Sequence, residues 1–505
     1  MRFLWEIDSS SIGSTWSLFD KGSESRRWYG NQYFVVKWTA EARAFYASNG
    51  GLTQKTYWDK CGVCWTDINK GTPNFRIKNG DTQYSSLSPT IFFQEHQDYI
   101  MGLLNSVVGE YFNNLINPSF HLNVGDVLSF PVYIKQCDNS FQVNKCISET
   151  KRDWDEYEYS LDFTSHPLVS NTLRDSLRNS INEVAKIHSD RFEAIIKNEE
   201  KLNEFYIDAY DLESELSPKV DPNEVTLFYK PNSFDGREID KKYLSHIILT
   251  LTSYSLGCMM GRYSLDREGL VYAHSSNNGF KELVAEGAYK TFPADDDGIV
   301  PLADEDWVFE DDATTRFREF VKTVWGDEHL QENLDFVAES LCLDAIKAKK
   351  GESSIDTIRR YFSTQFYKDH LKTYKKRPIY WLFSSGKAKA FECLVYLHRY
   401  NEGTLSRMRT EYVTPLMGKL ESRKNILEDS KATASGAELR AIDKELKTIE
   451  KKQAELVTFD EELKHLAEMK ISLDLDDGVK VNYGKFGNLL ADVKAIHGKN
   501  PEVIK

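Results

Sequence analysis

The spacing of hydrophobic residues along the chain changes several times, and each change predicts a different kind of structure. Within residues 1–135, short runs of aromatic and β-branched residues at 33–38 and 129–134 are typical of strands. Turn-forming clusters rich in Gly and Asn separate such runs, at 49–51 and 79–81. One helix is expected among them, near 97–114. This first region therefore predicts an α+β domain.

The next two regions differ from the first in polarity and in period. Residues 136–169 are polar and highly charged, and we expect them to form a linker. Apolar residues then recur every three or four positions across residues 170–402, which predicts a mostly α-helical domain. Its expected helices lie at 173–198, 201–216 and 244–263, the last of them apolar on nearly every side and so buried.

A heptad pattern near the end of the chain predicts a coiled coil. Hydrophobic residues alternate by three and four positions, with one Gln in the series, at Leu439, Ile442, Leu446, Ile449, Gln453, Leu456 and Leu463. A second helix is marked by Leu416, Leu420 and Leu427, and residues 431–436 form a plausible turn between the two. We therefore expect an antiparallel coiled-coil hairpin at 403–470, followed by a tail at 471–505.

Composition places the chain among globular proteins. It has 505 residues, of which 41% are hydrophobic and 28% charged, enough for three or four domains. Seven cysteines are few and odd in number, which argues against a disulfide framework. We find no apolar run of about 18 residues and no signal-peptide pattern, so we expect a cytoplasmic protein with no membrane partner.

Charge is distributed unevenly along the chain. The net charge is −14, which argues against nucleic acid on average. The first 80 residues, however, hold 11 basic and 7 acidic residues, a net charge of +4. Residues 295–312 contain nine carboxylates and no Lys or Arg, and we expect a solvated acidic loop there rather than a metal site. The asymmetry indicates an N-terminal domain that faces phosphate.

Two short motifs have both a chemical and a structural interpretation. Cys61 and Cys64 have the CxxC spacing of a zinc knuckle, but the nearest further cysteines, Cys137 and Cys146, are too distant for a second knuckle. Residues 117–120 (NPSF) approach the N-P-P-Y/F tetrad of amino-group methyltransferases, yet no strand and Gly-rich loop precede them to hold a cofactor. We favour two unpaired cysteines and a turn after a helix, with no metal ligands.

The cluster at residues 26–32 carries the sharpest candidate chemistry. Arg26 and Arg27 can bind phosphate or guanine edges, and Asn31 and Gln32 can pair with adenine. Stacking or positioning of DNA is assigned to Trp28 and Tyr29. The alternative is a surface turn whose aromatic rings belong to the core. Phosphate contacts in this domain are expected from Lys21, Lys37, Lys55, Lys60 and Lys78.

A second basic and aromatic stretch, at residues 359–381, is a candidate phosphate-binding surface. Its cations can position a nucleic acid without reading its sequence. The alternative is a solvated helix face above core aromatic rings. The proposed phosphate contacts are Lys372, Lys375, Lys376 and Arg377.

Stretches spread over most of the chain resemble, in order and spacing, the C-terminal portion of PglX, the adenine-specific DNA methyltransferase of BREX phage-defence systems. They are 21–31 (KGSESRRWYGN), 62–66 (GVCWT), 103–106 (LLNS), 117–118 (NP), 124–127 (VGDV), 198–203 (NEEKLN), 261–266 (GRYSLD), 295–301 (DDDGIVP), 377–383 (RPIYWLF), 398–400 (HRY) and 476–483 (DDGVKVNY). In that family, residues 117–118 fall in the closing helix of a target-recognition domain, and the Cys61 and Cys64 positions carry no paired cysteines.

The resemblance implies a divided function. Members of the family have an N-terminal domain with the S-adenosylmethionine and N-P-P-Y motifs, and this chain shows neither motif. We therefore expect no catalytic or cofactor-binding residue here, and S-adenosylmethionine in the missing domain. The implied role is DNA target recognition and docking in phage defence and the marking of self. Expected partners are double-stranded DNA, an N-terminal methyltransferase domain or subunit, and other BREX proteins. The rival interpretation is a non-catalytic interaction or specificity subunit that docks defence proteins.

Overall fold

The structure is a computed structural model of the chain, and it describes residues 1–22, 25–68, 72, 74–117, 119–135, 139–170, 176–230, 239–272 and 279–499. Several predicted features include residues that the structure does not describe. Pro118 of the NPSF motif and Cys137 lie outside the described residues. The first residues of the expected linker, 136–138, and the last of the expected tail, 500–505, do so too.

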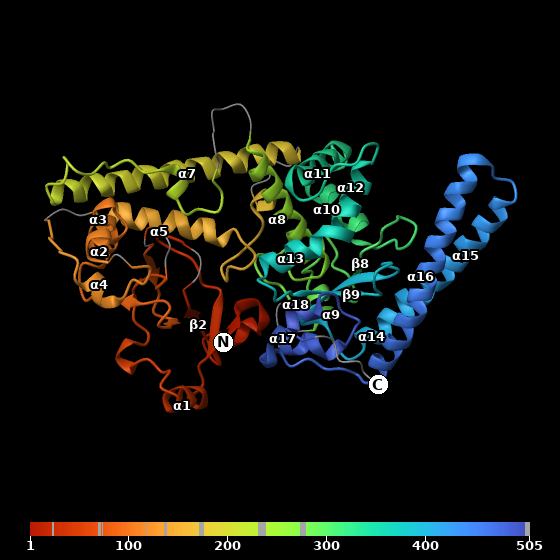
Figure 1. Cartoon of the computed structure of the whole chain (residues 1–505), viewed down its shortest axis with the longest axis horizontal. Coiled ribbons are helices and arrows are strands. Elements are labelled where there is room, and N and C mark those ends of the chain that lie inside the picture. The colour runs from red at the N-terminus through yellow and green to blue at the C-terminus, as the bar shows by residue number, and fades with distance from the viewer. Residues whose placement is uncertain are drawn as a thin grey trace. The chain divides into compact units, whose positions relative to one another are not determined.

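The chain divides into two compact units, which are described one at a time. Unit 1 comprises Met1–Leu4, Ser9–Asn171 and Asn179–Tyr243, and unit 2 comprises Trp5–Asp8, Thr172–Arg178 and Leu244–Lys505. The predicted mixture of helices and small sheets is confirmed, as Figure 1 shows, although the division into units differs from the predicted boundaries.

Unit 1 contains two small sheets. The first has the strand order β1 (Arg2–Phe3), β3 (Phe34–Lys37), β2 (Trp16–Asp20), β6 (Thr82–Tyr84), in which only the β2–β6 pair is parallel. The second has the order β5 (Arg76–Lys78), β4 (Gly62–Cys64), β7 (Thr90–Ile91), all antiparallel. The strand predicted at 33–38 is therefore confirmed. The strand predicted at 129–134 is wrong, because that segment pairs with no other strand.

The helix predicted near 97–114 is interrupted once. It forms α2 (Gln97–Leu104) and α3 (Val107–Ile116), and the Ser106 hydroxyl caps α3 by accepting the Gly109 N–H. A short helix, α4 (Val124–Leu128), follows. The two helices predicted at 173–198 and 201–216 are one continuous helix, α7 (Leu177–Ala209).

The expectation of a linker at 136–169 is wrong for most of that segment. Residues from Ser140 to Asp155 form α5, and its Val143, Cys146 and Trp154 side chains are buried in the core of unit 1. The apolar buried positions follow the helical period, and the polar residues Glu149 and Asp153 are buried as well. Both carboxylates are used in ion pairs, which are described below.

Unit 2 combines helices with a three-stranded antiparallel sheet that the sequence did not predict. The strand order is β8 (Ile299–Pro301), β10 (Glu392–Tyr396), β9 (Tyr380–Ser384). The predicted buried helix is confirmed as α8 (Lys241–Met259), whose Ile247 and Leu251 are fully buried. The remaining longer helices are α10 (Ala313–Trp325), α11 (Leu330–Asp344), α12 (Ser354–Tyr361) and α13 (Tyr367–Thr373).

The acidic stretch at 295–312 is more structured than a solvated loop. It contains β8, and the buried Asp312 carboxylate caps α10 by accepting the Thr315 N–H at 2.8 Å and pairs with the Arg359 guanidinium. Burial and the neighbouring Asp295 raise the pKa of Asp297 to about 8. The expectation of a loop exposed throughout is therefore wrong.

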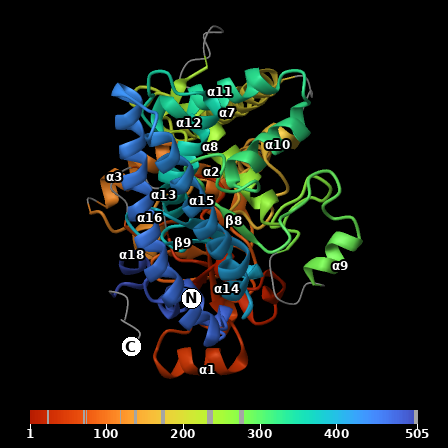
Figure 2. The same cartoon turned by 90° about the vertical axis from the view of Figure 1, so that its right-hand side faces the viewer.

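Two long helices of unit 2 form a hairpin, α15 (Thr414–Lys431) and α16 (Gly436–Glu468), visible in Figures 1 and 2. Ion pairs join Arg423 to Glu445 at 2.8 Å and Lys431 to Asp443 at 2.6 Å, an order that requires antiparallel helices. The predicted hydrophobic seam lies between them, buried at Leu416, Leu420, Leu427, Ile442, Leu446, Ile449, Leu456 and Leu463. The supercoil implied by the heptads stays a prediction.

One carboxylate of α16 organises the turn between β9 and β10. Glu455 accepts the Ser385 hydroxyl at 2.7 Å, the Ala388 N–H at 2.7 Å and the Ala390 N–H at 3.2 Å. A Cβ at Gly386 would lie 2.9 Å from the same carboxylate. The turn is thus built around a side chain of the hairpin.

No helix within the described ranges combines the length and the apolar character that crossing a bilayer requires.

We expect Leu456→Ala to lower the free energy of unfolding by about 2–5 kcal/mol, because Leu456 is fully buried and its loss leaves a cavity. The adjacent Val457 is 55% exposed, so Val457→Ala should change stability by less than about 0.5 kcal/mol. Urea denaturation followed by far-UV circular dichroism compares the two. Equal effects would contradict the hairpin packing.

Candidate nucleic-acid interface

The loop at residues 26–32 has an unusual backbone that is tied to β5. Trp28 and Asn31 both have positive φ, at 73° and 69°, a region that bulky residues rarely occupy. The Trp28 N–H donates to the Phe75 carbonyl at 2.8 Å, and its carbonyl accepts the Ile77 N–H at 2.9 Å. Glycine is required at position 30, where φ is +125° and a Cβ would lie 2.6 Å from the Arg26 Nε.

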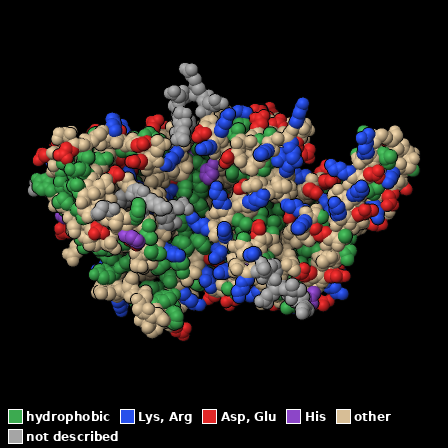
Figure 3. All heavy atoms as spheres, viewed as in Figure 1, with side chains coloured by type: hydrophobic (Ala, Val, Ile, Leu, Met, Phe, Trp, Pro, Cys, Tyr) green, Lys and Arg blue, Asp and Glu red, His purple; other side chains and the backbone are tan. Residues whose placement is uncertain are grey.

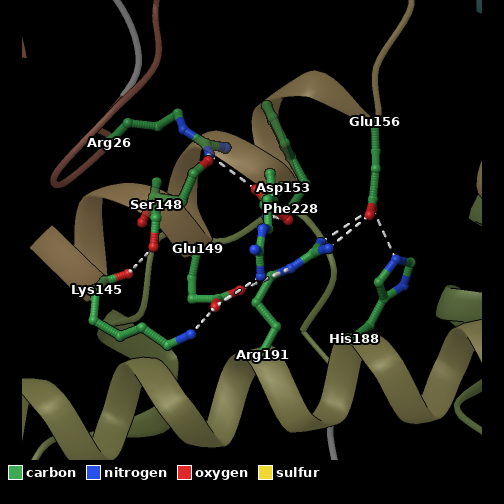
Figure 4. A network of polar contacts seen from close by, with 11 residues as sticks. Arg26, Lys145, Ser148, Glu149, Asp153, Glu156, His188, Arg191 and Phe228 are labelled. Atoms are coloured by element: carbon green, nitrogen blue, oxygen red, sulfur yellow. Dashed lines mark hydrogen bonds and ion pairs between the residues drawn. The ribbon is translucent and has the colours of Figure 1, made fainter. Parts of the chain in front are cut away.

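Arg26 is held by α5 rather than presented to solvent. Its guanidinium pairs with Asp153 at 2.8 Å and donates to the Tyr29 carbonyl at 3.1 Å, as Figure 4 shows in part. The same group lies 4.2 Å from the centre of the Phe228 ring. Arg26 is only 2% exposed, and Asp153 is fully buried. The pair therefore joins the loop to α5 from inside the unit.

Glu199 of α7 holds the next two residues of the loop. One carboxylate oxygen pairs with the Arg27 guanidinium at 3.1 Å, and the other accepts the Trp28 indole N–H at 2.6 Å. Arg27 also donates to the Asn74 side-chain carbonyl at 3.2 Å. Both oxygens of one carboxylate are thus used to fix two adjacent side chains, one charged and one aromatic.

The expectation that this cluster offers its side chains to DNA is not met in this structure. Arg26 and Arg27 are buried in the ion pairs just described. The other predicted base-reading and stacking residues are Asn31, Trp28 and Tyr29, all buried, and Gln32, which is half-buried. The partners that bury the arginines lie more than 120 residues away in sequence, so the local pattern held no sign of them. The cluster joins α5 and α7 through its two arginines.

A second network beside Arg26 joins α5 to α7 (Figure 4). Glu156 accepts the Arg191 guanidinium at 2.7 Å and contacts the His188 Nε2 at 2.8 Å. Burial alone would raise the pKa of Glu156, but the hydrogen bonds and charges of His188 and Arg191 outweigh burial and lower that pKa to about 2. Glu149 of α5 also lies 3.8 Å from the Arg191 guanidinium, and it pairs with Lys145 and Arg152 within its own helix. Glu149 and Glu156, the residue that follows α5, thus join this helix to α7.

The lysines predicted to contact phosphate in unit 1 fall into three groups. Lys55 and Lys60 are exposed, and Lys21 and Lys37 are half-buried. Lys78 is buried, and its ammonium donates to the backbone carbonyls of Lys60 at 2.6 Å and Asn79 at 2.9 Å. Burial lowers the pKa of Lys78. The phosphate contact of Lys78 stays a prediction, and in this structure its ammonium is already bonded to two carbonyls.

The basic stretch of unit 2 separates its cations from its aromatic rings. Tyr361, Tyr374 and Trp381 are buried, while the end of α13 and the turn after it carry the predicted cations. Lys372 and Lys376 are exposed, and Lys375 and Arg377 are half-buried. Lys375 and Lys376 both have positive φ, at 49° and 58°. This separation fits the alternative of a solvated face above aromatic core residues, and the face remains cationic.

The CxxC cysteines have different environments. The Cys64 thiol is buried and donates to Asp20 at 3.2 Å, and Asp20 also pairs with the buried Arg76 at 3.2 Å. Burial raises the pKa of the Cys64 thiol, so it stays protonated. Cys61 is exposed. Within the part of the chain that the structure describes, no three His, Cys, Asp or Glu residues are grouped to bind a metal ion.

Sequence reasoning missed a cleft beside the loop. It has a volume of about 610 Å³, and Arg26, Arg27, Lys230, Glu224 and Phe228 are among the residues that line it. The two arginines are neutralised by their carboxylate partners, so the Lys230 and Glu224 charges leave the lining close to neutral. The cleft is therefore a poor phosphate site on charge grounds. Its residues come from segments about 200 positions apart, which no local motif could bring together.

Comparison with known proteins gives the broadest indication of function. No family model matches the chain. It is 46% identical over 498 residues, 97% of this chain, to a protein of Escherichia coli O9:H4 (strain HS) called adenine-specific methyltransferase BrxX. It is 34% identical over 507 residues, 96% of this chain, to adenine-specific methyltransferase PglX of Lacticaseibacillus casei (strain Zhang).

These similarities support the family resemblance found in the sequence. They run along almost the whole chain, yet the chain spans only 41% and 40% of the length of these two relatives.

We expect Arg26→Ala to destabilise unit 1 by about 3–5 kcal/mol, because it leaves the Asp153 carboxylate buried without its cation. The exposed Lys60 provides the control, since Lys60→Ala should change stability by less than about 0.5 kcal/mol. Chemical denaturation measures both. A mild effect of Arg26→Ala would mean that the guanidinium is solvated in solution.

Glu156 predicts a pH dependence. Because its folded pKa of about 2 lies below the usual 4.5, it stabilises the protein at neutral pH by about 3 kcal/mol. This contribution is lost as pH falls from about 4.5 toward 2. The difference in unfolding free energy between wild type and Glu156→Gln should therefore be largest near pH 7 and shrink by more than half at about pH 3. A difference independent of pH would contradict the ion pairs.

Proposed function

We propose that this chain is the target-recognition and docking part of an adenine-specific DNA methyltransferase that marks self DNA in phage defence. The observation that carries the proposal is the similarity to two adenine-specific methyltransferases over 97% and 96% of the chain. The complete enzyme would extrude an adenine from double-stranded DNA and transfer a methyl group to its amino nitrogen. S-adenosylmethionine would supply that group, and no residue of the 505 is proposed to bind it.

Exposed cations support contact with the DNA backbone. Lys55 and Lys60 are exposed in the net-positive first region of the chain, and Lys372 and Lys376 are exposed in unit 2. Such contacts orient a protein on a duplex without reading its sequence. In this proposal, the buried Arg26 and Arg27 do not contact DNA. They fix the backbone of the loop at residues 26–32 within unit 1.

A second candidate function, an interaction subunit that docks other defence proteins, has its own observation. The hairpin of α15 and α16 buries only its seam, and its outer faces carry exposed charged residues along both helices. Such a surface suits recognition of a charged protein partner. In this alternative the chain would bind protein and not DNA.

Salt dependence of duplex binding tests the DNA proposal. Each lost phosphate contact should reduce the slope of log affinity against log salt by about 0.9. Lys55→Ala/Lys60→Ala should therefore weaken binding equally for all sequences and reduce the slope by about 1–2. The exposed α7 lysines Lys197 and Lys201 serve as a control, since neither belongs to the predicted contact set.

The outcomes separate the two candidates. An unchanged slope in Lys55→Ala/Lys60→Ala would remove these residues from the interface. Failure of the wild-type chain to retain any duplex at low salt would remove the DNA proposal and favour the interaction subunit.

A further inference from the structure

Exposed hydrophobic side chains concentrate in one region of unit 1. Between residues 115 and 141, nine large hydrophobic residues are exposed, of 22 found among all the described residues. They are Leu115, Ile116, Phe120, Val124, Leu128, Val132, Tyr133, Ile134 and Phe141. Residues 115–134 hold a single Asp, Glu, Lys or Arg residue, Asp126. Figure 3 shows hydrophobic side chains gathered at the edge of unit 1. Such an apolar surface with few charges is typical of a protein interface.

Within this region, residues 131–135 are held extended by two tyrosines instead of a strand. The Tyr210 hydroxyl donates to the Pro131 carbonyl at 2.7 Å and accepts the Tyr133 N–H at 2.9 Å. The Tyr99 hydroxyl donates to the Tyr133 carbonyl at 2.8 Å and accepts the Lys135 N–H at 3.3 Å. Each phenol thus takes the place of one residue of a neighbouring strand.

The opposite edge of this segment is open. In an extended chain, the backbone groups of alternate residues point to opposite sides, so those of Val132 and Ile134 point away from the two phenols. Within the described part of the chain, neither residue makes a backbone hydrogen bond. Their side chains are 48% and 39% exposed, and that of Tyr133 between them is 58% exposed.

An open edge with apolar side chains is a surface that proteins normally protect. Native edges carry charges, prolines or bulges that prevent a further strand from adding. Here residues 115–134 contain no Lys or Arg, and the two phenols fix the edge in advance. An extended peptide with alternating apolar residues would gain backbone hydrogen bonds from Val132 and Ile134 and bury the exposed side chains.

We propose that the edge at Val132 and Ile134 accepts a β-strand from the rest of the methyltransferase. The occupant is an extended, apolar segment from the part that the two relatives possess beyond the matched region, since this chain spans only 41% and 40% of their length. This inference rests on the proposed function, because it supplies the docking contact between these 505 residues and the part of the enzyme that carries the chemistry.

Synthetic peptides that tile the unmatched part of the Escherichia coli relative provide the probe, and fluorescence anisotropy with the full 505-residue chain measures binding. We expect one or a few alternately apolar peptides to bind. Val132→Pro removes an N–H that has no hydrogen-bond acceptor among the described residues, so it should reduce peptide affinity at least tenfold without unfolding the chain. The matched control Val132→Ala keeps the N–H and should lose less.

Amide hydrogen exchange gives a residue-specific readout. On peptide binding, exchange of the Val132 and Ile134 N–H groups should slow at least tenfold. The Tyr133 and Lys135 N–H groups are already bonded to phenols and should change little. If Val132→Pro disturbs the circular dichroism spectrum, Ile134→Lys replaces it, because a charge at this edge blocks an apolar strand and retains the N–H.

The remaining outcomes overturn the inference. Absence of binding by every peptide would do so, as would equal losses in Val132→Pro and Val132→Ala. A dimer in sedimentation velocity that Val132→Pro abolishes would assign the edge to a second copy of this chain instead. The same variants should retain duplex DNA as the wild type does, because the edge is not part of the proposed DNA contact. A failure of the wild type to bind DNA would refute the proposed function, whereas the peptide experiment would still test the edge.

Discussion

Unit 1 depends on two buried carboxylates that meet a single loop. Asp153 of α5 and Glu199 of α7 neutralise Arg26 and Arg27, which the loop would otherwise bury at a high desolvation cost. Glu199 also holds the Trp28 indole, whose residue has a positive φ. A strained backbone of this kind persists only where its surroundings over-determine it. The loop is therefore tied to two helices that lie more than 120 residues away in the sequence, and the backbone bonds of Trp28 to Phe75 and Ile77 tie it to β5.

The local elements with strong periodicity could be predicted from the sequence. The strand at 33–38, the buried helix α8 and the seam of the α15–α16 hairpin all follow from the spacing of apolar residues. The sheet of unit 2 could not, because β8 lies within an acidic stretch and pairs with β10 nearly 100 residues later. The charged composition of α5 predicts a linker, because the sequence does not reveal that Glu149 and Asp153 are buried in ion pairs with Arg191 and Arg26.

Contacts between distant residues also decide what the sequence can predict about the candidate site. Arg26, Trp28 and Asn31 have the residue types that read DNA, but residue type does not reveal burial. Burial here was decided by Asp153, and no pattern near residue 26 points to it. Conversely, the open edge at Val132 looked like an ordinary strand in the sequence. It became informative only because two tyrosine hydroxyls occupy the place of its neighbour.

The contact between Glu455 and the β9–β10 turn couples the hairpin to the sheet of unit 2. Helix α16 rises about 1.5 Å per residue, so the tip near Gly436 stands about 30 Å from Glu455. The hairpin is therefore a lever arm with one carboxylate at its base, and that carboxylate holds three groups of the turn. If a molecule binds the tip and displaces α16, the displacement reaches the turn through Glu455. From the turn it reaches β10 and then β8, the strand of the acidic segment that pairs with β10.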